Sequence, residues 1–506
     1  MDVTADGPTR VPSPSGAPGR VAQHAPGTRV VLDGTGLRVD GVVGLADGTA
    51  APVVPEAALE RARRSWHTAD RLARTGRLYG RGTGVGAHRS VTVTAGDETD
   101  HGLRLLRSHA GGAGALLPAR HVRAMLAVRA NQLLAGGSGI QPAFITALTE
   151  ALRLGVHPAV HEYGGLGTGD LTALAETGLT LIGERPWLGR RSGGLPAPVS
   201  LRPGDALALL SSNALVLGRA ALACHELSML LRATHAVAAL SLAAVSGSLE
   251  AYAAPVHAVR PYPGPARAAA EVRRLLGVPD RPGPSQGRIQ DPYGFRAFPQ
   301  AHGPALEAAE ALRRVVEVEV NCPSENPLIG ADGTAHHHGG FFAAPLGLAL
   351  DGLCLALLQT AQLSGARLAA LGRPDLTGLP AFLASGAASS SGTMILEYTA
   401  NSALAELRSC AAPASAGHAV LSHGLEDAAS FASQAARQTL RAAEAYRTVL
   451  ACELVTAVRA LRLHPDPPSV PAFTMAAAAL PADTEDRPLT GDVTAAAELL
   501  PALAEL

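Results

Sequence analysis

The sequence predicts a mainly α fold, in which a bundle of long helices carries a small α/β part near the N-terminus. Apolar residues recur at the helical period over long stretches, and aromatic residues make up only 3% of the chain. Alanine and leucine dominate instead, which suits close helix packing better than an aromatic-rich sheet core. No repeat with a period of roughly 20 to 50 residues stands out.

Four segments follow one another along the chain. Residues 1–28 are rich in Pro, Gly and Ser and are expected to form a disordered tail. Residues 29–200 open with the alternation and turns of a small β element, and they are expected to form an N-terminal domain. Residues 201–470 are expected to form the central long-helix bundle. Residues 471–506 follow a Pro-rich stretch and are expected to cap the bundle.

Glycines and prolines mark the ends of the expected helices. "HVRAMLAVRANQLLAGGSG" reads as a helix ended by glycines, and "AFITALTEALRLGVHP" as another stopped at proline. The longest apolar run, residues 205–255, includes polar residues that would be costly in lipid, so we expect a buried helix and no membrane span. These residues are Arg219, Glu226, Arg232 and His235. The helical period returns in residues 340–372, 392–412 and 426–463.

Composition narrows the classes of function. The net charge of -1 and pI of about 7.0 provide no basic field for nucleic acid or an anionic membrane, so a small-molecule partner is expected. The chain has no lysine, which excludes a lysine Schiff base and with it pyridoxal phosphate chemistry. Five widely spaced cysteines without a C-x-x-C pair, and an N-terminus without signal-peptide order, predict reduced thiols and a cytoplasmic protein.

Seven polar stretches interrupt the apolar helices. They are "LYGRGTGVG" (78–86), "RSHAGGAG" (107–114), "GGLGTGDLTALAE" (164–176), "QDPYGFRAFPQ" (290–300), "NCPSENPLI" (321–329), "GGFFAAP" (339–345) and "SHGLEDAAS" (422–430). One such stretch is a weak signal, because glycines suit any backbone that needs positive φ or a close approach. In this order, the seven resemble the histidine and aromatic amino acid ammonia-lyase family over residues 29–506.

The resemblance implies a fold, a reaction and an assembly. The fold is a fumarase/aspartase-like long-helix bundle whose N-terminal domain carries active-site loops. Members build the electrophile 4-methylideneimidazole-5-one from an Ala-Ser-Gly tripeptide, and they eliminate ammonia from an amino acid to give an α,β-unsaturated acid. Some relatives return the amine to the β carbon instead. The active site is implied to be assembled from several subunits of a homotetramer.

The electrophile motif departs from the family pattern in this chain. Gly167, Thr168 and Gly169 stand where Ala-Ser-Gly is usual, and the loop is one residue shorter. Small residues on both sides of Thr168 permit the tight turn that cyclisation needs, and the threonine hydroxyl can leave by dehydration. The product would be an ethylidene, whose extra methyl hinders attack. The shorter loop also alters the strain that brings the backbone into a reactive geometry.

Two motifs imply the base and the carboxylate clamp. Tyr79 matches the family's catalytic base, a role that requires its pKa to fall from about 10 through helix N-termini or positive neighbours. Tyr293 and Arg296, with Gln290, match the signature Gln-Asp-Pro-Tyr-x-x-Arg, and an arginine fork suits a substrate carboxylate. The plainer interpretations are a buried tyrosine in a glycine-rich loop and an arginine that forms a structural salt bridge.

Three further residues imply a polar substrate ring. Ser108 and His109 match the pair that contacts the substrate side chain in histidine-type members, and Glu426 matches their glutamate. Glutamate and histidine can hydrogen bond both nitrogens of an imidazole. Phe341 matches the phenylalanine beside the prosthetic group, although packing alone would explain it.

Other positions depart from the family or lack chemistry. The family's substrate-side asparagine falls on Ser211, and Asn213 is two residues on, which on a helix lies about 200° around the axis and excludes a simple replacement. The histidine that often follows the Glu-Asp pair is Ala428. No metal site is expected, because the adjacent residues His336–His338 do not converge on one ion.

Three hypotheses remain. The first is an ammonia-lyase, or an amine-shifting relative, that acts on histidine or another polar-ring amino acid with an electrophile made from the divergent triad. The second is an enzyme without the electrophile that uses Tyr79, Tyr293 and Arg296 for acid-base elimination or addition on a carboxylic acid. The third is a non-catalytic scaffold. The persistence of the pocket residues favours the first.

Overall fold

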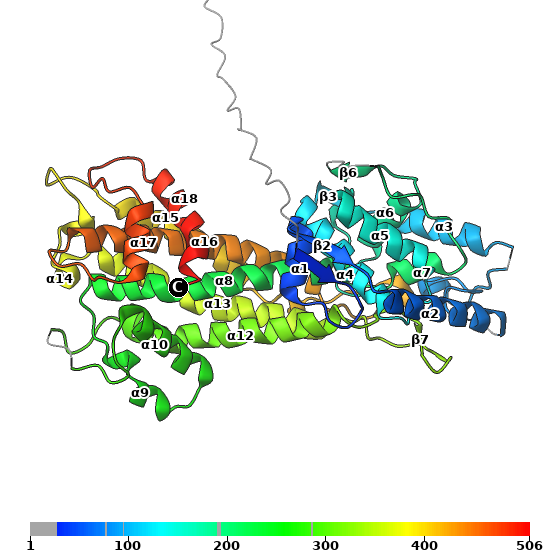
Figure 1. The fold of residues 1–506 in the computed structure, drawn as a ribbon, viewed down its shortest axis with the longest axis horizontal. Helices are drawn as coiled ribbons and strands as arrows, with labels where there is room; N and C mark the ends of the chain where they lie inside the picture. Colours follow the sequence, from blue (N-terminus) through cyan, green and yellow to red (C-terminus); the bar gives the residue numbers. More distant parts are fainter. Residues whose placement is uncertain (1–27, 76–77, 95, 190–193, 285–286) are drawn as a thin grey trace, which may run out of the picture.

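The computed structural model describes residues 28–75, 78–94, 96–189, 194–284 and 287–506. The tail expected over residues 1–28 lies outside these residues, apart from Thr28. The molecule is elongated, with the N-terminal part at one end and long helices that run from it to the other end (Figure 1). The predicted mainly α fold with a small N-terminal α/β part is confirmed.

The α/β part is a single β-α-β unit. Strand β1 (Thr28–Val31) pairs in parallel with β2 (Ala50–Val53), and α1 (Val39–Asp47) connects them. The rest of this end is helical with short strand pairs. It contains α2 (Glu56–Thr75), α3 (Glu98–His109), α4 (Ala119–Leu134), α5 (Pro142–Leu154), α6 (Leu171–Leu181) and α7 (Asp205–Leu210), and the antiparallel pairs β3 (Ala113–Leu116) with β5 (His161–Tyr163) and β4 (Val156–Pro158) with β6 (Trp187–Gly189).

Four long helices form the body of the molecule. They are α8 (Ala214–Ala244), α12 (Phe298–Glu319), α13 (Ala344–Leu371) and α16 (Ala432–Leu463). Shorter elements complete the chain: α9 (Ala254–Ala258), α10 (Pro263–Leu276), α11 (Tyr293–Arg296), α14 (Pro374–Thr377), α15 (Met394–Cys410), α17 (Pro471–Ala479), α18 (Thr490–Leu503) and the pair β7 (Leu328–Ile329) with β8 (Ala335–His336).

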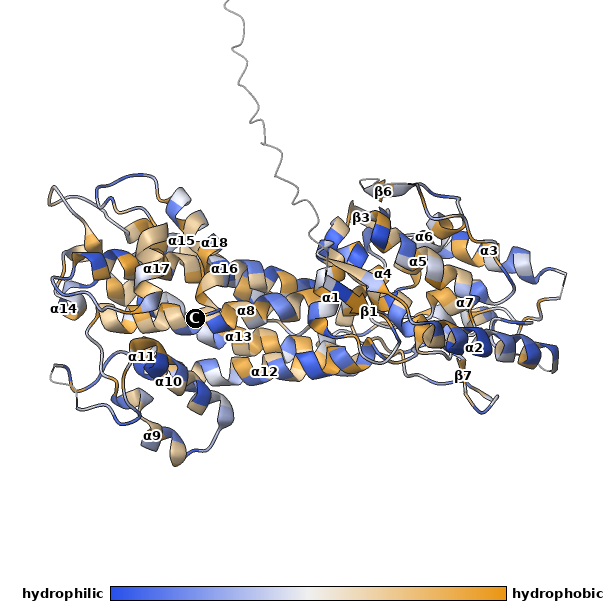
Figure 2. Cartoon of the chain, in the orientation of Figure 1, coloured by the Kyte–Doolittle hydropathy of each residue, from blue (hydrophilic) through white to orange (hydrophobic). Residues whose placement is uncertain are grey.

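Helix α8 is the centre of the core. Most of its residues are buried, and α16, α4 and α12 pack around it, so other helices cover its apolar surface. By contrast, α2 is largely hydrophilic along its length (Figure 2). One fully buried ion pair crosses the bundle, where Arg367 of α13 contacts Glu453 of α16 at 2.6 Å.

The helix boundaries differ from the sequence expectation at three places. The apolar run from residue 205 forms two helices, α7 and α8, separated at Ser211–Asn213. Helix α5 ends at Leu154, and Gly155, with φ of 71°, supplies a left-handed C-cap three residues before the expected proline. Helix α16 begins at Ala432, because the residues from Glu426 onward form a loop instead of its first turns.

Candidate active site

The loop between α2 and α3 places Tyr79. Gly80 has φ of 73°, and a Cβ there would lie 2.0 Å from Leu207 Cδ2, so this turn requires glycine. The half-buried Tyr79 hydroxyl oxygen accepts a hydrogen bond from the Gly86 backbone N–H at 2.8 Å. The phenol oxygen therefore has a fixed position with a donor that also stabilises a phenolate.

The pKa of Tyr79 is raised above its ordinary value, chiefly by burial and further by the negative charge of Glu426. The Gly86 N–H and Arg89 act in the opposite direction without overcoming burial. A tyrosine that acts as a catalytic base requires a lowered pKa. In the single chain that requirement is not met, because the positive neighbours around this phenol are outweighed by desolvation.

One cavity of about 630 Å³ gathers four of the expected residues. Its lining includes Tyr79, Ser108, His109 and Glu426, which come from three separate segments of the chain. Ser422 also lines the cavity. It was not among the expected site residues, although it lies within the "SHGLEDAAS" stretch. The predicted base and the predicted ring-binding residues thus share one pocket.

His109 has a defined tautomer in this pocket. Its Nδ1 lies 2.9 Å from the backbone carbonyl oxygen of Leu105, which only accepts hydrogen bonds, so Nδ1 carries the proton and donates it. The Ser108 hydroxyl donates to the same carbonyl at 3.1 Å. Nε2 of His109 is consequently left as a hydrogen-bond acceptor.

The divergent triad reaches this pocket through Thr168. The Thr168 hydroxyl donates to Glu426 Oε2 at 3.1 Å, which joins the triad loop to the pocket wall. The two glycines of the triad have positive φ, 80° at Gly167 and 115° at Gly169. Their lack of a Cβ makes this backbone path possible.

The two groups that cyclisation would join, the Gly167 carbonyl and the Gly169 N–H, each have a side-chain hydrogen-bond partner. The Gly167 carbonyl oxygen accepts from Ser430 Oγ at 2.8 Å and from the Ala343 N–H at 3.2 Å. The Gly169 N–H donates to Asn213 Oδ1 at 3.0 Å. Donors on the carbonyl and an acceptor on the nitrogen fit the formation of an imidazolone ring at this triad.

Asn213 contacts the triad, contrary to the expectation from a continuous helix. Because residues 211–213 are not helical, the 200° rotation does not apply, and Asn213 sits at the N-cap position of α8 facing the triad. Its Nδ2 donates to the Phe341 carbonyl at 2.5 Å. The backbone carbonyl of Ser211 accepts from the Ser324 hydroxyl at 3.1 Å. Asn213 therefore contacts the triad and the Phe341 segment together.

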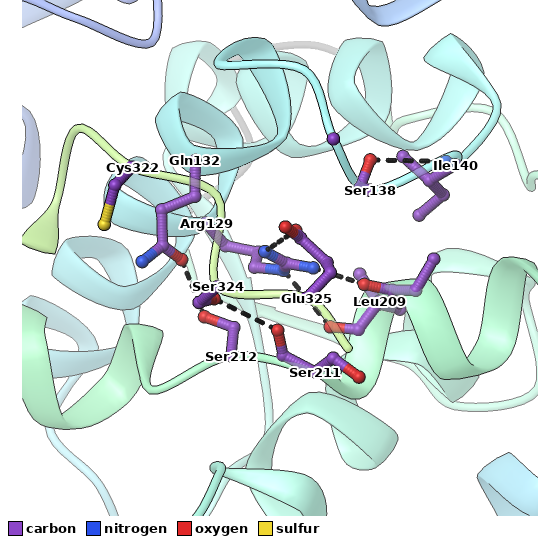
Figure 3. Close-up of polar contacts among 12 residues, drawn as sticks. Arg129, Gln132, Ser138, Ile140, Leu209, Ser211, Ser212, Cys322, Ser324 and Glu325 are labelled. Carbon is purple, nitrogen blue, oxygen red and sulfur yellow. Dashed lines mark hydrogen bonds and ion pairs between the residues drawn. The ribbon is translucent and has the colours of Figure 1, made fainter. Parts of the chain in front are cut away.

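A buried polar network fixes the break between α7 and α8 (Figure 3). Fully buried Arg129 donates to the carbonyls of Ala208 and Leu209, which lack helical partners, and pairs with Glu325 at 2.8 Å. Ser212 donates to Gln132 at 2.6 Å beside it. These contacts hold the segment that presents Asn213.

Asp170 anchors the other side of the triad to the same helix. Its carboxylate accepts from the backbone N–H groups of Leu215 and Val216, in the first turn of α8. Burial nevertheless raises the pKa of Asp170 to about 6, even though these hydrogen bonds and Arg219 act to lower it. The aspartate, which directly follows Gly169, thus joins the triad loop to the start of α8.

The predicted carboxylate clamp lies far from this pocket. Tyr293 and Arg296 lie on α11, at the end of the bundle opposite α3 and α7 (Figure 2), and Gln290 is exposed just before them. The guanidinium of Arg296 stacks over the Tyr293 ring at 4.3 Å, and the Tyr293 side chain is 68% exposed. A single chain does not bring these residues to Tyr79.

Buried side chains hold the backbone of the short helix α11 in place. Arg367 donates to the Gly294 carbonyl at 3.0 Å, and the Tyr252 hydroxyl donates to the Phe295 carbonyl at 2.6 Å. Arg367 is itself held by Glu453. The clamp residues therefore occupy a fixed platform that faces outward.

The histidine run has separate partners. His336 Nε2 lies 2.8 Å from the Thr334 hydroxyl, and His338 Nε2 lies 2.7 Å from the Glu325 carbonyl. Within the described parts of the chain, no three His, Cys, Asp or Glu residues form a group able to hold a metal ion.

Comparison with known proteins gives a consistent result. The family model for aromatic amino acid lyases matches residues 37–481. A histidine ammonia-lyase of Geobacillus kaustophilus is 37% identical over 398 residues, covering 76% of this chain and 79% of that relative. Ergothionase from Treponema denticola, an ergothioneine-degrading enzyme, superposes with a TM-score of 0.85 at 25% identity over 94% of this chain and 99% of its own. The tyrosine aminomutase from Streptomyces globisporus superposes with a TM-score of 0.87 at 27% identity over 94% and 97%.

Proposed function

The chain belongs to the aromatic amino acid lyase family and is a carbon-nitrogen lyase, and we propose that it removes or shifts the amine of histidine or a similar polar-ring amino acid. The product of elimination is an α,β-unsaturated acid. The observation that carries this proposal is the single pocket that holds Tyr79, the Ser108–His109 pair and Glu426, with Thr168 of the triad bonded to that glutamate.

Ring recognition rests on two acceptors in the pocket. His109 Nε2 accepts because Nδ1–H is committed to Leu105, and Glu426 has acceptor capacity beyond its one hydrogen bond to Thr168. Two acceptors match a ring with two N–H donors, such as an imidazolium. A phenyl ring offers neither donor and would leave these half-buried acceptors without a partner on the substrate.

Proton transfer falls to Tyr79. Its raised pKa makes it a neutral phenol at rest, so it gains base strength only when the substrate and a positive neighbour arrive. As a phenolate it takes the proton from the β carbon while the Gly86 N–H stabilises its oxygen. The prosthetic group would form from Gly167–Thr168–Gly169 and would supply the electrophile that draws electrons from the substrate.

The carboxylate clamp comes from another copy of the chain in this proposal. Tyr293 and Arg296 face outward at the far end, and exposed apolar side chains on α13 and α15 offer a surface for helix packing between copies. The exposed residues are Leu348, Leu355, Ile395 and Tyr398. A homotetramer that carries Arg296 to the pocket of a neighbour supplies both the carboxylate site and a positive charge near Tyr79.

Subunit complementation tests this assembly. Tyr79→Phe and Arg296→Ala are each expected to be inactive alone, while co-expressed chains regain part of the activity, because some mixed sites receive an intact tyrosine and an intact arginine. Each variant re-mixed with itself is the control. Failure of the mixture to exceed the single variants would show that both residues do not meet across copies.

Two observations favour a second candidate. Threonine replaces the usual serine in a shortened loop, and the ergothionase similarity points to a substrate that carries its own leaving group. Ergothioneine is a betaine whose trimethylammonium group leaves as a neutral amine, and its thione ring has two N–H donors for His109 and Glu426. Such an elimination needs Tyr79 and Arg296 but no electrophile.

A substrate pair separates the two candidates. Turnover of L-histidine, followed by near-ultraviolet absorbance of the unsaturated acid, supports the first. Turnover of ergothioneine with none of L-histidine supports the second. Activity on other amino acids or betaines that survives Tyr79→Phe would contradict both.

A further inference from the structure

The Gly167 carbonyl accepts two hydrogen bonds that favour nucleophilic attack on its carbon. It lies in a buried loop, and it accepts from Ser430 Oγ at 2.8 Å and from the Ala343 N–H at 3.2 Å. Ser430 is itself only 4% exposed, so water does not compete for this carbonyl. Two fixed donors on one carbonyl oxygen stabilise the negative charge that develops when a nucleophile attacks its carbon.

The nucleophile of that attack is the Gly169 nitrogen, and it too has a fixed partner. Its N–H points at Asn213 Oδ1 at 3.0 Å, and Asn213 is 5% exposed. The amide of Asn213 is locked in this orientation because its Nδ2 donates to the Phe341 carbonyl. The acceptor is thus aimed at the proton that cyclisation must remove.

The glycine at the first triad position is matched to Ser430. A Cβ at Gly167 would lie 2.1 Å from Ser430 Oγ, so the alanine usual at this position would displace the hydroxyl that now binds the carbonyl. The smaller residue lets Ser430 approach. The departure from Ala-Ser-Gly therefore comes with a compensating contact.

We propose that Ser430 and Asn213 drive the self-cyclisation of Gly167–Thr168–Gly169, with Ser430 polarising the carbonyl and Asn213 orienting the attacking nitrogen. This inference rests on the electrophile of the proposed function. Both are positioning residues, since neither contacts the amino acid substrate in this account.

The reaction balances without an oxidant. The Gly169 nitrogen bonds to the Gly167 carbonyl carbon, and its proton is transferred to the former carbonyl oxygen. The first water removes that oxygen and the Thr168 N–H, leaving a carbon-nitrogen double bond. The second water removes the Thr168 hydroxyl and the Cα proton, leaving a carbon-carbon double bond to the ethylidene carbon.

The test follows the mass of freshly translated chains over time. The wild type is expected to lose two waters, about 36 Da, from the peptide that contains Thr168. Ser430→Ala and Asn213→Ala are expected to cyclise roughly 10²-fold more slowly, as for the loss of one oxyanion donor. Ser433→Ala is the matched control, because this nearby buried serine hydroxyl has no hydrogen-bond partner within the described residues. It should cyclise at the wild-type rate.

A second pair of variants guards against simple misfolding. Ser430→Thr keeps the hydroxyl and Ser430→Val removes it at nearly the same volume, so only the former should cyclise readily. Equal rates for this pair, or a wild-type rate in Ser430→Ala, would overturn the inference while leaving the proposed function intact. An unmodified wild type would instead refute the electrophile itself, and with it this inference and the first candidate function.

Discussion

Replacing Gly167 with alanine restores the residue that the family usually places first in its triad, yet we expect Gly167→Ala to destabilise this chain. Gly167 has φ of 80°, and a Cβ there would lie 2.1 Å from Ser430 Oγ and 2.8 Å from Ala432 N. Left-handed backbone costs an alanine about 1–2 kcal/mol, and overpacking costs about 1–3 kcal/mol more. The sum is about 2–5 kcal/mol.

Melting temperatures compared at one protein concentration measure this effect, since a chain of 506 residues is not expected to unfold in two states and any self-association would make the melting temperature depend on concentration. The control is Gly283→Ala, where no atom lies within 4 Å of the added Cβ. Combining Gly167→Ala with Ser430→Ala should recover part of the loss, because the hydroxyl clash disappears while the contact with Ala432 N remains. A Gly167→Ala variant that melts at or above the wild-type temperature would refute the reasoning.

Three further changes have expected outcomes. Glu426→Gln removes a negative charge that raises the pKa of Tyr79. The rise of kcat/KM with pH follows phenolate formation, so it should move to lower pH in this variant. A pH profile that does not move would show that the charge of Glu426 does not act on Tyr79. Glu453→Gln leaves Arg367 buried without its counter-charge and should destabilise the chain by about 3–5 kcal/mol. It should also raise KM, because Arg367 holds the backbone of α11, which carries Arg296. An unchanged melting temperature would contradict this expectation. The pKa of Asp170 is raised to about 6, so between its ordinary value of 3.8 and that pH the folded chain keeps a proton that the unfolded chain has released. Stability should therefore fall by about 3 kcal/mol as pH rises through this window, and Asp170→Asn should flatten the fall in a pH series of melting temperatures.

Motif order was sufficient to predict the family, the long-helix fold and four residues of the pocket. Tyr79, Ser108, His109 and Glu426 could be located because each sits in a stretch whose residue types and spacing are specific. The domain boundaries and the roles of these residues stay predictions.

Tertiary structure decided the features that the sequence analysis missed. The break at Ser211–Asn213 falls on three consecutive polar residues within one apolar run. A polar stretch this short also fits the interior of a helix, so Asn213 was wrongly placed on a continuous helix. The direction of the Tyr79 pKa shift depends on burial and on Glu426, which lies far away in sequence. A motif also does not say where its residues lie relative to the rest of a site: Arg296 is on α11, at the end of the bundle opposite α3 and α7.

The central claim is that Gly167–Thr168–Gly169 becomes the electrophile of an amine-eliminating enzyme. Intact mass of the purified wild-type protein, with peptide mapping across Thr168, tests it most directly. We expect a deficit of two waters, about 36 Da, confined to the triad peptide. A chain with its full unmodified mass would contradict the claim and leave elimination of a substrate's own leaving group as the reaction to pursue.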